Sequence, residues 1–150
     1  MFWLLLGCSV GEPPAGTLRE DLEGLGDRTR LPPNVASARW LTQAGESDRV
    51  GGGRGDARLV AWVAVPGGAT EWLGSTVGQP IGPRAHWVSE DVARTLLTTA
   101  ELSVLQYNPT RKSWKLACVR YPGLGLGLRD YSAGVVLECG DHLYLALSAR

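Results

Sequence analysis

Two histidines, His86 and His142, are the side chains best suited to acid–base or metal chemistry in this sequence. His142 follows Asp141 and lies three positions after Cys139, so these three residues could hold a metal ion or move a proton. A zinc site needs three or four ligands at workable spacing, and only the distant His86 remains as a further nitrogen donor. We therefore interpret this segment as a polar turn between two strands, and we predict no metal site and no cofactor.

Other catalytic patterns are missing or have a structural explanation. The sequence contains no Gly-x-Ser-x-Gly nucleophile motif. Glu90 and Asp91 are adjacent, so on a helix they would not face each other, whereas both suit the first turn of a helix. The glycines of residues 123–128 are spaced by two, which differs from the Gly-x-Gly-x-x-Gly dinucleotide fingerprint, and we expect a flexible apolar hairpin loop there. We identify no catalytic residues.

An apolar run at the N-terminus ends in Leu5-Leu6-Gly7-Cys8. This stretch resembles the lipobox of bacterial lipoproteins, in which an aliphatic, a variable and a small residue precede an invariant cysteine. The resemblance implies cleavage before Cys8, a lipid anchor on its thiol, and sorting to the outer membrane by Ser9. Residues 1–7 would then be a signal-like segment, and residues 8–16, rich in Pro and Gly, a flexible tether. The alternative is an uncleaved N-terminal strand.

Lipidation of Cys8 would leave two further cysteines, Cys118 and Cys139, an even number suited to an oxidising compartment. Each alternates with apolar residues on a predicted strand. An antiparallel register centred on Leu128-Arg129 would place the two cysteines opposite each other, which makes a cross-strand disulfide geometrically feasible. The alternative is a pair of buried free thiols.

Candidate contact residues are aromatic or apolar. Trp62 and Trp72 could stack on the sugar rings of a cell-wall glycan if they were exposed, although core packing is the commoner fate of strand tryptophans. Leu124 and Leu126 in the glycine-rich loop could form a contact patch for a partner protein.

The pattern of elements predicts an α+β domain over residues 17–150, with an antiparallel sheet of about six strands packed against one principal amphipathic helix. We expect that helix over Val88 to Ala100, with Ser89 as its N-cap. A short helix from Leu18 to Leu25 would begin in a capping box formed by Thr17 and Glu20.

Three hairpins are predicted. In the first, Arg58 to Val65 turns at Gly67-Gly68 and pairs Trp62 with Leu73. The second joins Leu102 to Tyr107 with Ser113 to Tyr121, and the third joins Ala133 to Cys139 with Leu143 to Ser148.

Composition narrows the class of protein. The 150 residues include 15 basic and 15 acidic side chains, and we therefore expect no nucleic-acid partner, because phosphate binding needs clustered excess positive charge. The sequence favours a small exported lipoprotein with a non-enzymatic binding or assembly role on the periplasmic or outer side of the cell envelope. Its partners would be the lipid bilayer, through Cys8, and another envelope protein or a glycan. The alternative is a cytosolic or virion-type structural subunit.

Overall fold

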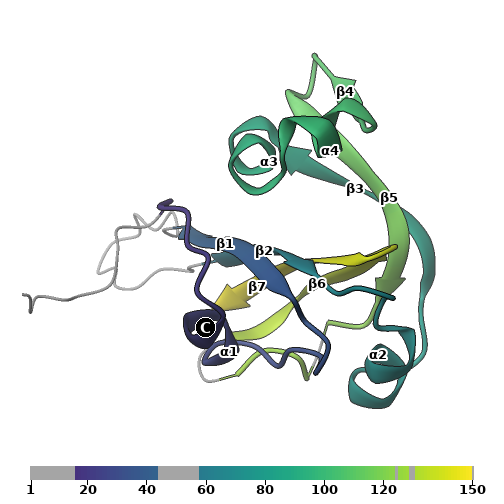
Figure 1. Cartoon of the computed structure of the whole chain (residues 1–150). Helices are drawn as coiled ribbons and strands as arrows, with labels where there is room; N and C mark the ends of the chain where they lie inside the picture. Colours follow the sequence, from purple (N-terminus) through teal and green to yellow (C-terminus); the bar gives the residue numbers. More distant parts are fainter. Residues whose placement is uncertain (1–15, 44–57, 124, 129–130, 150) are drawn as a thin grey trace, which may run out of the picture.

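The structure, a computed structural model, describes residues 16–43, 58–123, 125–128 and 131–149, and within these ranges it contains seven strands and four short helices (Figure 1). The strands are β1 (Ser37–Gln43), β2 (Arg58–Ala64), β3 (Gly82–Ser89), β4 (Gln106–Asn108), β5 (Ser113–Tyr121), β6 (Tyr131–Cys139) and β7 (His142–Ala149). The helices are α1 (Leu22–Gly26), α2 (Thr70–Thr76), α3 (Glu90–Leu96) and α4 (Thr99–Ser103). None of the helices in the described ranges is long and apolar enough to span a bilayer.

All strand pairs are antiparallel, in the order β1-β2-β7-β6-β5-β3, with β4 paired to β5. The predicted α+β class with a mainly antiparallel sheet is therefore confirmed. The second and third predicted hairpins are present as β4–β5 and β6–β7, although Leu102 belongs to α4 rather than to a strand. Gly140, in the turn of the third hairpin, has a φ of 66°, a conformation that glycine adopts without strain.

The first predicted hairpin is wrong. Gly67 and Gly68 do form a turn, with φ values of 83° and 82°, but the chain then enters α2 instead of a strand. Trp62 pairs with Arg39 of β1 and Tyr144 of β7, so both edges of β2 are occupied by other strands. A local turn signal could not reveal these more distant partners.

The single principal helix over Val88 to Ala100 is also not observed. Val88 and Ser89 end β3, α3 follows, and the chain becomes extended at Leu97 before α4 begins. The break has a local cause: Thr98 and Glu101 form a complete capping box that starts a new helix. Ser89 is the N-cap residue of α3, as predicted, but its side chain makes no capping hydrogen bond.

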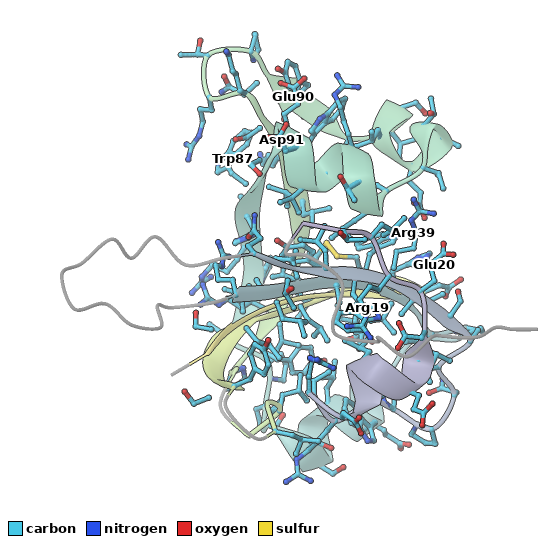
Figure 2. All side chains as sticks on the ribbon, turned by 90° about the vertical axis from the view of Figure 1, so that its left-hand side faces the viewer. Arg19, Glu20, Arg39, Trp87, Glu90 and Asp91 are labelled. Carbon is cyan, nitrogen blue, oxygen red and sulfur yellow. A yellow bond between two sulfur atoms is a disulfide. The ribbon has the colours of Figure 1, made fainter. Side chains whose placement is uncertain are left out.

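The predicted capping box of Thr17 and Glu20 is wrong as well. Arg19 instead forms an isolated bridge with Trp40, and α1 begins after Asp21, whose carboxylate accepts a hydrogen bond from the Gly24 amide at 3.0 Å. Figure 2 shows Arg19 and Glu20 on the same side of the molecule as Arg39, and Arg39 lies 3.5 Å from the Glu20 carboxylate.

Both faces of the central strands β2 and β7 are buried, so two cores form. The first core lies on the α1 and α2 side of the sheet and includes Trp40, Leu59, Ala61, Val63, Leu73, Leu143, Leu145 and Leu147. The second core lies on the α3 and α4 side and includes Val60, Trp62, Val92, Leu96, Leu116, Tyr144 and Ala146. Alternation along a strand sends successive side chains to opposite faces, which explains this division.

Strand β5 runs from the part of the molecule that holds α3, α4 and β4 to the part that holds β6 and β7 (Figure 1). These two parts are called the level of α3 and α4 and the level of the sheet. Its C-terminal residues, from Val119 to Tyr121, pair with β6, whereas its N-terminal residues, from Ser113 to Lys115, pair with β4. Cys118 therefore lies just where β5 separates from β6.

Candidate functional site

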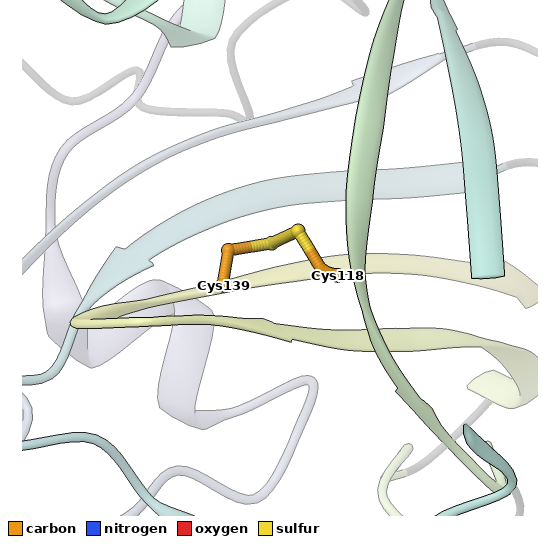
Figure 3. Close-up of a disulfide and its surroundings, with 2 residues drawn as sticks. All are labelled: Cys118 and Cys139. Atoms are coloured by element: carbon orange, nitrogen blue, oxygen red, sulfur yellow. A yellow bond between two sulfur atoms is a disulfide. The ribbon is translucent and has the colours of Figure 1, made fainter. Parts of the chain in front are cut away.

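A disulfide joins Cys118 and Cys139 at this separation point, with a Cα–Cα distance of 4.9 Å (Figure 3). Val119 pairs with Glu138, so the register of the two strands is the one that the sequence predicted. The predicted disulfide is therefore confirmed, and the alternative of two buried free thiols is not observed.

The disulfide lines a pocket of about 490 Å³ between the second core and α4. Leu97 and Leu116 supply part of its apolar wall. Glu101 of α4, His142 of β7 and Trp62 of β2 bring polar groups to it. The pocket thus combines apolar walls with few polar groups, as small-molecule sites commonly do.

Glu101 connects three elements at this pocket. Its Oε1 accepts a hydrogen bond from the Thr98 amide at 2.8 Å, and its Oε2 accepts one from Trp62 Nε1 at 3.1 Å. The same Oε2 lies 3.5 Å from His142 Nε2. Burial by itself would raise the pKa of Glu101, but the donors at Thr98 and Trp62 and the charge of His142 outweigh burial and lower it. Glu101 is therefore a carboxylate at neutral pH.

His142 is held by contacts on more than one side. Its ring stacks on the Trp62 indole with 4.6 Å between the centroids and an interplanar angle of 8°. Its Nε2 faces Glu101, and its strand position pairs directly with Cys139 across the β6–β7 hairpin. The arrangement thus places an imidazole–carboxylate pair, which can give or take a proton, next to a disulfide.

The predicted contact residues that the structure describes do not form a common surface. Trp62 is only 8% exposed and has His142 stacked on its ring, so it offers no open platform for a sugar. Trp72 lies on α2 and packs, partly buried, against the first core. Leu126 is fully buried, which removes it from any contact patch, and Leu124 lies outside the described residues.

The glycine-rich loop is anchored where the structure describes it. Arg30 donates from its backbone amide to the Leu126 carbonyl at 2.9 Å and from its side chain to the Gly125 carbonyl at 2.9 Å. Thr29, which is buried, donates from its hydroxyl to the Leu126 carbonyl at 3.2 Å. These hydrogen bonds and the burial of Leu126 in the first core hold this part of the chain in place, whereas the sequence predicted a flexible loop.

His86 is not part of the pocket. It lies on β3 against Tyr144, with 5.3 Å between the ring centroids, and burial and the nearby charges of Arg58 and Arg120 lower its pKa. Among residues with described positions, no group of three or more His, Cys, Asp or Glu side chains is arranged to hold a metal ion.

Glu101, the residue that joins the elements of this site, is not among the residues predicted from the sequence. A signal was present, because Thr98-Thr99-Ala100-Glu101 matches the capping-box pattern and marks a helix start close to the pocket. Asp141 lies in a turn, as predicted, whereas His142 is the first residue of β7 and also lines the pocket. Cys8 lies outside the described residues.

No protein-family model, curated protein or solved structure matches this chain.

Proposed function

We propose that this chain is an exported bacterial lipoprotein, anchored through Cys8, that acts as a binding or assembly component of the cell envelope. The observation that carries the proposal is the Cys118–Cys139 disulfide. The chain has three cysteines, so this bond leaves Cys8 as the one cysteine for a lipid anchor. Disulfides form and persist in oxidising compartments outside the cytosol, which agrees with an exported protein.

The lipobox-like residues supply the second part of the argument. Leu5-Leu6-Gly7-Cys8 and the Pro- and Gly-rich segment after it have the order expected of a signal, an anchor and a tether. In this proposal Ser9, directly after the anchored cysteine, directs the protein to the outer membrane.

The pocket beside the disulfide supports a binding role. Its walls are mainly apolar, and Val104, which also lines it, is 82% exposed. An exposed apolar side chain at a concave site is well placed to contact a ligand or a partner side chain.

Intact-mass measurement tests the proposal. The gene would be expressed in a bacterium with its upstream region included, and the membrane fraction would be compared with that of the Cys8→Ser variant. We expect a chain that starts at Cys8 and carries diacylglyceryl and acyl groups, whereas Cys8→Ser carries no lipid and leaves the membrane fraction.

Recovery of a lipid-free chain that retains its N-terminal methionine would refute the proposal. That result would favour the alternative of a cytosolic or virion-type structural subunit.

A further inference from the structure

Cys139 and His142 close the β6–β7 hairpin. They are direct partners in the strand register, so their side chains leave the same face of the sheet with Cβ atoms about 5 Å apart. Both residues also line the pocket described above. The His142 imidazole and the Cys139 sulfur therefore belong to the same face of the hairpin and the same pocket, and Cys118 lies at the other end of the sulfur–sulfur bond.

The imidazole is held in a fixed orientation. Glu101 faces one ring nitrogen at 3.5 Å, and the Trp62 indole covers one ring face at a centroid distance of 4.6 Å. A carboxylate at one nitrogen of an imidazole determines how the other nitrogen is presented. A protonated imidazole beside a cysteine stabilises the thiolate, which makes that cysteine a better leaving group in thiol–disulfide exchange.

We propose that Cys118–Cys139 is a reactive disulfide, in which the His142–Glu101 pair activates the Cys139 sulfur for exchange with small thiols that enter the pocket. This activity goes beyond the proposed binding role and does not depend on the anchor at Cys8. Both cysteines are only half-buried, and both line a second hollow of about 560 Å³ as well as the pocket. A thiol can therefore approach the sulfur atoms from solvent.

The reaction with a dithiol reductant proceeds in two steps. In the first, one reductant thiolate attacks Cys118 Sγ, the sulfur–sulfur bond breaks, and the electron pair goes to Cys139 Sγ, which leaves as a thiolate beside His142. In the second, the other reductant thiolate attacks the reductant sulfur of the mixed disulfide and releases Cys118. The dithiol is oxidised to a disulfide, the protein disulfide is reduced by two electrons, and the two reductant protons end on the cysteines or in solvent.

Other charged side chains also lie near the disulfide in the part of the chain that the structure describes, and Arg84 is the direct strand partner of Cys118. Lys115 lines both hollows from β5, and Arg84 and Glu138 line the second one. Asp141, which lies in the hairpin turn, directly precedes His142. Because these groups are common to every variant proposed below, a difference between variants reports on His142 and Glu101.

The test measures the rate at which dithiothreitol reduces the oxidised full-length protein at pH 7. Samples are quenched with acid, alkylated and analysed by mass spectrometry. We expect reduction of the unaltered protein to be about three- to tenfold faster than that of His142→Asn. Glu101→Gln should lie between the two, and the matched control His86→Asn should react like the unaltered protein.

Loss of stability cannot imitate this result, because a loosened fold would expose the disulfide and speed its reduction. A second measurement follows alkylation of the reduced protein by iodoacetamide as a function of pH. We expect Cys139 to react at lower pH than Cys118, and this difference to disappear in His142→Asn. Equal reduction rates for the unaltered protein and His142→Asn, or identical alkylation profiles for the two cysteines, would overturn the proposal.

Discussion

Two glutamates each hold together elements that are far apart in the sequence. Glu101 joins α4 to β2 and β7 through Trp62 and His142. Glu138 joins β6 to α2, because its carboxylate accepts from the Ala69 amide at 2.9 Å and from the Thr70 hydroxyl at 3.0 Å. It also accepts from the Tyr121 hydroxyl at 3.1 Å, and Tyr121 is otherwise buried. Each carboxylate therefore satisfies several donors at once.

Replacing Glu138 with Ala should lower the free energy of unfolding by about 2–3 kcal/mol, because the buried Tyr121 hydroxyl and the amide of Ala69, the N-cap residue of α2, lose their acceptor. Urea denaturation followed by tryptophan fluorescence measures the change. The matched control is Glu71→Ala on the exposed side of α2, for which we expect a change within about 0.5 kcal/mol. Equal losses in the two variants would mean that the hydrogen bonds of Glu138 contribute nothing specific.

The lowered pKa of Glu101 predicts that the free energy of unfolding depends on pH. Burial opposes its charge, but its donors and His142 lower its pKa in the folded protein below the value in the unfolded chain. The carboxylate therefore contributes stability above the unfolded pKa, and this contribution is lost as the pH falls through the lower folded pKa. The stability difference between the unaltered protein and Glu101→Gln should shrink with acidification. A difference that stays constant across the acid range would contradict this assignment.

At the scale of elements, local sequence patterns predicted where the strands lie better than they predicted which strands pair with each other. The alternation in β5, β6 and β7 gave their positions, and the two cysteines gave the register between β5 and β6. The partners of β2 could not be predicted, because they come from β1 and from β7, more than 70 positions later along the chain. The pocket could not be predicted for the same reason, because its side chains come from β2, α4, β5, β6 and β7.

The pairing of β6 with β7 depends on a glycine in its interior. A Cβ at Gly134 would clash with the Ala146 carbonyl and the Leu147 backbone, whereas a Cβ at Gly74 in α2 would meet open space. We expect Gly134→Ala to lower the free energy of unfolding by at least about 2 kcal/mol. Gly74→Ala should instead raise it by up to about 1 kcal/mol, because alanine favours helix. Chemical denaturation compares the two, and a neutral Gly134→Ala would show that the strands can move apart there.

At the scale of the whole molecule, the disulfide secures the junction between the sheet and the level of α3 and α4. Only three residue pairs, from Val119 to Tyr121, connect β5 to β6, and the cysteines lie directly beyond them, 21 positions apart in the chain. A cross-link of this loop length contributes about 3 kcal/mol by the chain-entropy estimate.

Replacing Cys118 and Cys139 together with alanine should therefore lower the free energy of unfolding by about 3 kcal/mol. Hydrogen exchange should quicken first in β5 near position 118 and in α3 and α4, since the second core that holds them there loses its covalent support. Chemically reduced, unaltered protein is the control, and it should show the same protection pattern as the double variant. If exchange quickened evenly over the whole sheet instead, the disulfide would stabilise the fold only globally, and the junction between β5 and β6 would be maintained by packing alone.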